Sequence, residues 1–240
     1  MKPAAAKRRT HENGLTALLL VFPLFLVYQV GVLALPEVYN GADLITSELL
    51  RLLHGQRAYY LLVNGALLAA FLIATAILRR KNEFHASAFL RVIAESALYA
   101  VTMGSLICFV MRDVLHVDPR LAVAGPEQAG PLAKIVLSFG AGVHEELVFR
   151  LMMIPAIVAI GEKLFKLRRF LALILAFLIS SLLFSLAHHV IGGEPFRVGV
   201  FVYRTLCGLV FASIFQWRGF ATDVYTHALY DVFVLLVQGA

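Results

Sequence analysis

The sequence predicts an all-α integral membrane protein, a polytopic bundle of transmembrane helices. Hydrophobic residues make up 60% of the 240-residue chain and charged residues only 15%, against about 45–50% and about 25% in soluble proteins. The mean hydropathy is +0.83, and the apolar residues form runs near the roughly 20 residues that cross a bilayer. Such a chain cannot cover itself with polar surface in water, which excludes a soluble enzyme, a disordered regulator and a secreted disulfide scaffold.

Seven segments are expected as membrane-spanning helices: 15–35, 59–78, 90–111, 132–160, 170–187, 198–215 and 221–237. The fourth is too long for an upright helix, so we expect it to tilt, to kink at Pro155 or to end early. An eighth, half-length or re-entrant element is compatible with the pattern. No internal repeat or long linker is present, so we expect one membrane domain. Within it, residues 1–131 form N-terminal helices and loops, and residues 132–240 form the core that carries the polar motifs.

Charged residues cluster between the apolar segments, as the orientation signals of membrane proteins do. The 21 basic and 15 acidic residues give a net charge of +6. Basic residues precede the first segment and follow the second and the fourth: Lys2, Lys7, Arg8, Arg9, Arg79, Arg80, Lys81, Arg91, Lys163, Lys166, Arg168 and Arg169. Acidic residues are more frequent in the loops between these positions: Glu37, Asp43, Glu48, Asp113, Asp118 and Glu127. The positive-inside rule then places the N-terminus in the cytoplasm. The short basic N-terminus favours a bacterial inner membrane. No nucleic-acid partner is expected, because the basic residues are not interleaved with aromatic residues on one polar face.

Two acidic residues and an arginine lie near the middle of the fourth segment. Ionisable groups inside a span cost about 2.5–3.5 kcal/mol each on insertion scales, so each needs a function or a partner. Glu146 and Arg150 are four residues apart with the acid first, which favours an ion pair. Glu145 points about 100° away on the same helix, which leaves it available as a general base. The alternative is that both acids pair with basic groups on other helices.

Two histidines and an aspartate occupy the later apolar segments. His188 ends the fifth segment, where the adjacent His189 could replace it. His227 and Asp231 are four residues apart on the seventh segment and share a face, which suits an oriented imidazole, an oxyanion clamp, two metal ligands or a hydrogen-bonded helix pair. Together with the acidic doublet, these groups supply a base, a partner that orients water and oxyanion donors. Hydrolysis of a peptide bond is the simplest reaction that uses all of them.

Three motifs follow one another between residues 132 and 231. They are Glu-Glu-x-x-x-Arg at residues 145–150, Phe-x-x-x-His at Phe184 and His188, and His-x-x-x-Asn/Asp at His227 and Asp231. In these motifs and their order the chain resembles the CPBP intramembrane proteases, also called the CAAX prenyl protease 2 or Abi family. The segment around Arg204 looks like the family's helix between the last two motifs.

The resemblance implies transmembrane helices packed around a water-filled intramembrane cavity. It implies a metal-independent glutamic-type endopeptidase that acts on a membrane-associated protein or peptide and needs no cofactor. Glu145 would be the general base, acting on water together with His188. His227 and Asp231 would stabilise the tetrahedral oxyanion.

The resemblance also assigns supporting roles. Glu146 and Arg150 would form the supporting ion pair, and Arg204 is either a site residue or a snorkelling or helix-pairing arginine. Asp231 stands where the best-understood relatives have asparagine. An ionised aspartate cannot donate a hydrogen bond, so Asp231 would act protonated or by orienting His227.

Two other readings of the same residues stay open. Two histidines with carboxylates can make a three-ligand zinc site with one open position, and a non-enzymatic scaffold, immunity factor or transporter subunit could use the polar cluster for binding. Simple counting also places His188 near the outer end of its helix and His227 near the inner end of its own. They meet only if helix limits shift, a helix tilts strongly, or the loop at 217–219 lies within the membrane.

Overall fold

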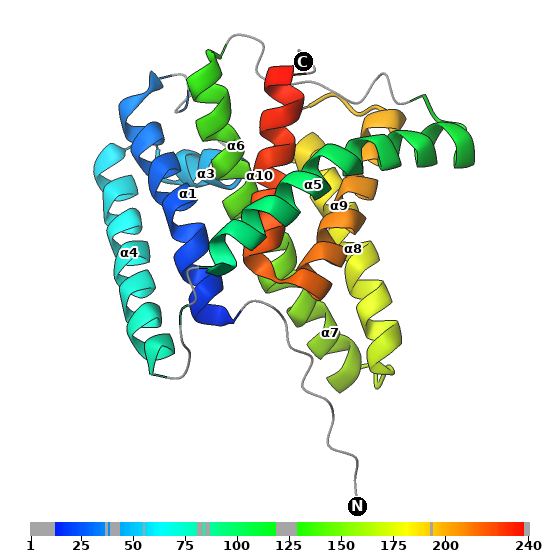
Figure 1. The fold of residues 1–240 in the computed structure, drawn as a ribbon, viewed down its shortest axis with the longest axis horizontal. Coiled ribbons are helices and arrows are strands. Elements are labelled where there is room, and N and C mark those ends of the chain that lie inside the picture. The colour runs from blue at the N-terminus through cyan, green and yellow to red at the C-terminus, as the bar shows by residue number, and fades with distance from the viewer. Residues whose placement is uncertain are drawn as a thin grey trace, which may run out of the picture.

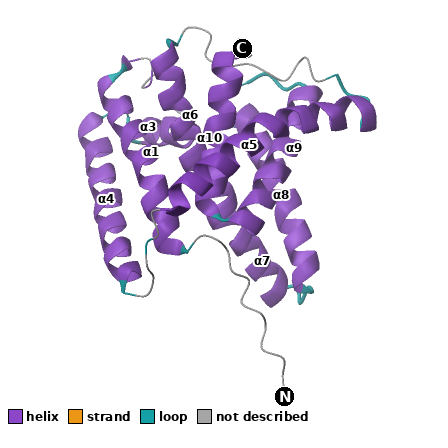
Figure 2. Ribbon diagram, in the orientation of Figure 1, coloured by secondary structure: helices purple, strands orange, loops and turns teal. Residues whose placement is uncertain are grey.

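The computed structural model describes residues 13–36, 38, 44–54, 56–80, 84, 87–118, 129–192 and 194–237, and every regular element in them is helical (Figure 2). The α-helices are α1 (Gly14–Ala34), α3 (Leu44–Leu52), α4 (Arg57–Arg79), α5 (Ser87–Phe109), α6 (Pro131–Glu146), α7 (Met153–Lys163), α8 (Arg169–Val190), α9 (Val198–Arg218) and α10 (Phe220–Val237). Two π-helical stretches, η1 (Val110–Val114) and η3 (Leu147–Met152), continue α5 and α6. The predicted all-helical fold is confirmed.

Five of the described helical stretches are long and apolar enough to cross a membrane: Gly14–Ala34, Ala58–Arg79, Ser87–Val114, Arg169–Val190 and Val198–Arg218. The expected number of seven is not confirmed, because the fourth predicted segment is divided between α6, η3 and α7, and the seventh forms α10, which is not among the five. Several charges used to predict the orientation lie outside the described residues: Lys2, Lys7, Arg8, Arg9, Glu37, Asp43, Lys81 and Glu127.

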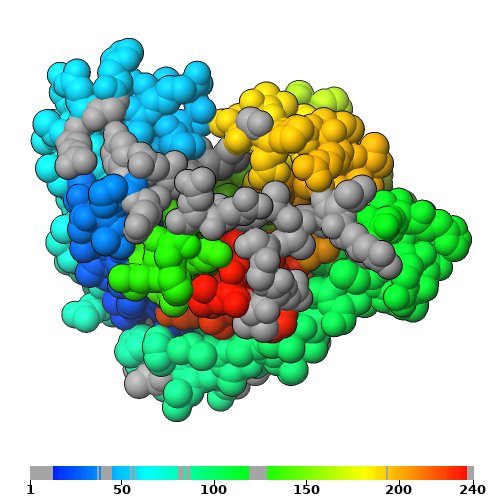
Figure 3. Space-filling model, turned by 90° about the horizontal axis from the view of Figure 1, so that it is seen from above, coloured from blue at the N-terminus to red at the C-terminus, as the bar shows by residue number. Residues whose placement is uncertain are grey.

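α6 and α10, which carry the first and the last polar motif, lie at the centre of the bundle, and α8, which carries the second, lies toward one edge (Figure 1). α10 has its most extensive contacts with α6 and α5, while α8 packs between α7 and α9. α5 crosses the bundle diagonally, and α4 lies at the outer edge against α1. Seen from above, residues of α1 (dark blue) lie on one side of α6 and α10 (green and red), and residues of α8 and α9 (yellow and orange) lie on the other (Figure 3).

Glycine permits the closest helix contacts in this centre. A Cβ atom at Gly142 of α6 would lie 2.9 Å from the carbonyl oxygen of Val224 and 3.0 Å from the Cβ of Ala228, both on α10. A Cβ atom at Gly208 of α9 would lie 2.9 Å from the Cβ of Ser181 on α8. Small residues at such crossings let helix backbones approach, and here they hold α10 close to α6 and α9 close to α8.

The predicted fourth segment changes its helical form directly after the acidic doublet. α6 ends at Glu146, and the chain continues through η3 before α7 begins at Met153. A π-helical turn is wider than an α-turn and often marks a functional site. The Ser180 hydroxyl on α8 donates a 2.6 Å hydrogen bond to the carbonyl of Phe149 within this turn. The helical path thus continues beyond the doublet in a changed form, and the irregularity precedes Pro155.

The turn between α9 and α10 explains how His188 and His227 come to lie at the same depth in the bundle. Gly219 joins the two helices with a φ of 110°, which favours glycine. Figure 1 shows this turn drawn in from the end of the bundle where α4, α7 and α8 end. Beside it, Arg218 makes a forked ion pair with Glu95 of α5. α10 therefore starts inside the bundle, and about two turns bring His227 level with the last turn of α8.

Candidate active site

The three sequence motifs converge on the carboxylate of Glu145. This side chain lies in the last turn of α6 and is 4% exposed. The Nε2 atom of His188 is 3.7 Å from Glu145 Oε1, and the Nε2 atom of His227 is 3.9 Å from Glu145 Oε2. Both distances are too long for a direct hydrogen bond, while a water molecule about 2.8 Å from each partner could bridge them.

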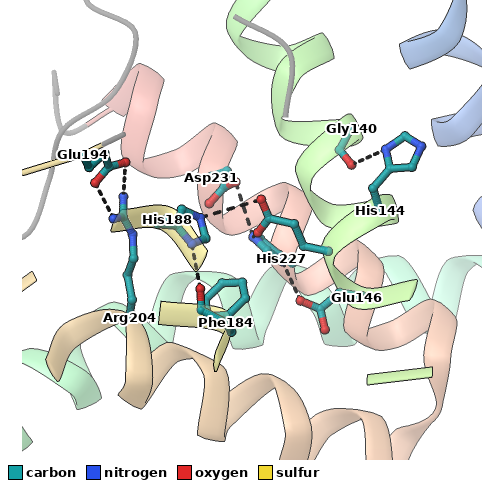
Figure 4. Close-up of polar contacts among 10 residues, drawn as sticks. Gly140, His144, Glu146, Phe184, His188, Glu194, Arg204, His227 and Asp231 are labelled. Atoms are coloured by element: carbon teal, nitrogen blue, oxygen red, sulfur yellow. Dashed lines mark hydrogen bonds and ion pairs between the residues drawn. The ribbon is translucent and has the colours of Figure 1, made fainter. Parts of the chain in front are cut away.

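The position of His188 is fixed through its other ring nitrogen. Nδ1 donates a 2.9 Å hydrogen bond to the carbonyl oxygen of Phe184, one turn earlier on α8 (Figure 4). A neutral ring that donates from Nδ1 has an acceptor at Nε2, which is the nitrogen that faces Glu145. The Nδ1 atom of His189 instead lies 3.3 Å from the backbone oxygen of Glu194. The structure thus places His188, and not its neighbour, against the carboxylate.

His227 is held between α6 and α9. Its Nδ1 donates a 2.6 Å hydrogen bond to Glu146 Oε1, and its ring stacks on that of Phe211 with centroids 4.4 Å apart. These contacts aim Nε2 toward Glu145, with Asp231 Oδ2 3.5 Å away. A carboxylate that orients an imidazole from behind fixes the ring nitrogen that remains free for chemistry.

The predicted ion pair between Glu146 and Arg150 is present and fully buried. Arg150 Nε lies 3.0 Å from Glu146 Oε2, and both side chains are 0% exposed. The guanidinium group also faces the ring of Phe184, with its carbon 4.4 Å from the centroid, and donates to the carbonyl of Gly208 at 3.4 Å. Glu146 therefore links a buried cation to His227, and each of its two oxygens has a distinct partner.

Asp223 is a buried acid that the sequence analysis missed. It is 0% exposed, lies near the carboxylate of Glu146, and precedes His227 by one turn on the same face of α10. The spacing of four that joined His227 to Asp231 also joins Asp223 to His227. Extending that spacing one turn toward the N-terminus would have found it.

One edge of the cluster is more accessible than its centre. The side chains of His188, Arg204 and Asp231 are 17%, 15% and 29% exposed, against 5% for Glu145 and His227. At this accessible edge Arg204 of α9 makes a forked ion pair with Glu194. Glu194 is a second residue that the sequence analysis missed. Burial alone would raise the pKa of Glu194, but its hydrogen bond and charge interaction with Arg204 lower the pKa below its ordinary value.

The arrangement gives no support to the zinc alternative. Among the residues that the structure describes, no group of three or more His, Cys, Asp or Glu side chains could hold a metal ion.

The bundle has several helices of membrane-crossing length and a buried cluster of acids and histidines. Residues 128–233 match the Rce1-like family, described as type II CAAX prenyl endopeptidase Rce1-like. This range holds every predicted site residue and confirms the resemblance to the CPBP or CAAX protease family. Neither the curated proteins nor the solved structures contain a match to the chain. The chain is an integral membrane protein with an Rce1-like segment, and this family implies a peptidase with a protein substrate.

Proposed function

We propose that the chain is an intramembrane endopeptidase of the glutamic type, which hydrolyses peptide bonds of membrane-associated proteins near a C-terminus or a membrane span. The observation that carries the proposal is the placement of Glu145 between the Nε2 atoms of His188 and His227, at 3.7 and 3.9 Å. This space is lined by a base, a second proton acceptor and a potential donor, which is the set that peptide hydrolysis needs. The proposed reaction uses neither a metal nor a cofactor.

In the first step a water molecule lies between Glu145 and His188. Glu145 takes a proton from this water as its oxygen forms a bond to the carbonyl carbon of the substrate. His188 Nε2 accepts the second hydrogen of the water and holds the attacking lone pair in place. Because the hydrogen bond from Nδ1 to Phe184 fixes the ring, this orientation exists before substrate binds.

In the second step the carbonyl oxygen of the substrate becomes an oxyanion. His227 donates to it from Nε2 while Nδ1 donates to Glu146, so the ring is an imidazolium stabilised by the Glu146 carboxylate. Asp231, at 3.5 Å from Nε2, orients this ring when ionised and donates only when protonated. The intermediate then collapses: the C–N bond breaks, and the proton on Glu145 passes to the leaving amine.

We also propose that residues 132–240 form the catalytic unit and that the helices of residues 1–131 enclose it. Seven spans result if the α6–η3–α7 segment and α10 cross the membrane with the five apolar helices. The N-terminus then lies in the cytoplasm of a bacterial cell with this protein in its inner membrane. The basic clusters around the apolar segments support this orientation.

The test compares protein termini by mass spectrometry in cells that express the native chain, Glu145→Gln or Glu162→Gln at matched levels. Gln keeps the volume of Glu145 and removes the base, whereas Glu162 lies at the end of α7 and pairs at 3.6 Å with the exposed Arg169. A defined set of C-terminal or juxtamembrane cleavages should vanish with Glu145→Gln and persist with Glu162→Gln. Unchanged termini together with a phenotype that survives Glu145→Gln would show that the chain is a non-enzymatic scaffold.

A further inference from the structure

A second charged group lies beside the proposed active site, the pair of Arg204 and Glu194. Arg204 donates from Nη1 to Glu194 Oε2 and from Nη2 to Glu194 Oε1, the latter at 2.8 Å. This is the two-pronged geometry in which a planar guanidinium recognises a carboxylate. The reaction steps proposed above do not use it.

The pair is attached directly to the end of α8 that carries the catalytic histidine. The backbone N–H of Glu194 donates to the carbonyl of His188 at 3.3 Å. On the other side, the Ser185 hydroxyl of α8 donates to the carbonyl of Phe201, one turn before Arg204 on α9, at 2.8 Å. Figure 4 shows the guanidinium of Arg204 next to His188, on the side away from His227. A peptide held at Glu145 would therefore pass within reach of Arg204.

Arg204 is more accessible to a ligand than Arg150, the other arginine of the site. Arg150 is fully buried and committed to Glu146, whereas Arg204 and Glu194 are 15% and 31% exposed. Because the pair has access to solvent, a second carboxylate can reach Arg204, and exchange of one carboxylate for the other keeps the same two-pronged contact. Glu145 and Asp231 would repel an incoming carboxylate, and Arg204 offsets this repulsion at the accessible edge.

We propose that Arg204 binds a carboxylate of the peptide substrate, and that Glu194 takes the place of this carboxylate while the site is empty. The proposal rests on the proposed function and adds substrate selectivity to it. The substrate carboxylate can come from a free C-terminus or from an acidic side chain near the scissile bond. Both present the same two oxygens to the guanidinium, and the experiment below separates them.

The experiment measures kcat and KM of the full chain in detergent or lipid discs on three forms of one peptide spanning a cleavage site found by the terminal proteomics. One form has a free C-terminus, one has an amidated C-terminus, and one has its acidic side chains replaced by amides. Native protein should prefer the form with the recognised carboxylate by about 10-fold or more in kcat/KM, the effect of one charged hydrogen-bonded contact. Loss of this preference on amidation identifies the C-terminus, and loss on side-chain replacement identifies an acidic side chain.

Variants of the pair decide whether Arg204 is responsible. Arg204→Gln should bring the ratio between the charged and neutral peptides to about one, and Arg204→Lys should retain part of it because charge remains without the fork. Glu194→Gln should lower KM for the charged peptide, because the competing carboxylate is gone. Arg218→Gln is the matched control: it opens a forked ion pair of similar exposure at the far end of α9 and should leave the ratio unchanged.

Two outcomes would overturn the proposal. Native protein could cleave all three peptides equally, or Arg204→Gln could slow all three by the same factor, which would make the pair a structural contact. Binding of the three peptides to Glu145→Gln protein, with and without Arg204→Gln, tests carboxylate recognition without hydrolysis. Equal cleavage by native and Glu145→Gln proteins would contradict the proposed function. Equal binding of the three peptides to Glu145→Gln protein that keeps Arg204 would contradict only the role of Arg204.

Discussion

The Nδ1 atom of His227 donates a 2.6 Å hydrogen bond to Glu146 Oε1, and through it α10 and α6 act as one unit. Glu146 adjoins Glu145 in the chain, so the same helix turn presents one acid to the substrate space and the other to the back of the imidazole. The second oxygen of Glu146 faces the guanidinium of Arg150. A buried cation, a carboxylate and an imidazole thus form a continuous chain behind the proposed base.

Breaking the buried pair should unfold the site. Glu146→Gln leaves the Arg150 cation uncompensated in an apolar bundle, which costs about 3–5 kcal/mol. We expect a large fall in the thermal unfolding midpoint in detergent. Replacing both partners, as Glu146→Gln with Arg150→Met, should recover most of the midpoint but not the peptidase activity, because His227 loses its anionic partner. A double variant no more stable than the single one would contradict this account.

The helix crossing at Gly142 should matter for activity. A Cβ atom there would lie 2.9 Å from the carbonyl oxygen of Val224, so Gly142→Ala must push α10 away from α6 and lengthen the contact between His227 and Glu146. We expect kcat to fall by about 10-fold or more, since small displacements in an active site are costly. Gly65→Ala on α4, where nothing lies within 4 Å of the new atom, is the control. Equal kcat in both variants would show that the crossing tolerates the methyl group.

Asp231 offers a test of the oxyanion role. Asn at this position can donate a hydrogen bond whatever the pH, whereas an ionised Asp cannot. We expect Asp231→Asn to retain or raise kcat, and Asp231→Leu, which removes the group, to lower kcat by about 100-fold. Steady-state kinetics on one peptide measures both. Loss of activity in Asp231→Asn equal to that in Asp231→Leu would mean that the negative charge itself is needed.

A second buried network should affect stability alone. The Tyr60 hydroxyl donates to Gln29 Oε1, and Gln29 Nε2 donates to His144 Nε2 at 3.3 Å, which ties α4 and α1 to α6. Gln29→Leu strands the partners of this amide, at a cost of about 1–3 kcal/mol. We expect a lower thermal midpoint and an unchanged kcat at temperatures where the variant is folded. A fall in kcat at those temperatures would show that this network, on the other side of α6, also supports the active site.

The pair at the accessible edge predicts a pH dependence of stability. Because Arg204 lowers the pKa of Glu194 below its ordinary value of 4.5, the carboxylate binds fewer protons in the folded chain than in the unfolded chain near that pH. Its stabilising contribution is therefore full above this ordinary value and is lost as the pH falls through the lower, folded value. The thermal midpoints of native protein and Glu194→Gln should differ at pH 7 and converge on acidification. A constant difference down to pH 3 would contradict the assignment.

The apolar composition and the run lengths predicted a helical membrane protein, and the polar motifs predicted the resemblance of its C-terminal segment to this family. Contacts within one helix followed from spacing. Glu146 and Arg150 pair as their separation of four predicts, and His227 and Asp231 share a face. Such contacts are local, because 3.6 residues per turn fix which side chains are neighbours on a helix. The number of spans did not follow, since η3 and the turn at Gly219 change where helices start and end.

The contacts between helices were decided only by the tertiary structure. The meeting of Glu145 with His188, of Glu146 with His227, and of Arg204 with Glu194 depends on how close and how deep each helix packs. Gly142 and Gly208 set two of these approaches, and the inward position of the α9–α10 turn sets a third. Periodicity along one helix carries no information about its depth against another, because depth results from the packing of all helices at once. The sequence therefore determined which groups are available for chemistry, and the packing determined which of them face each other.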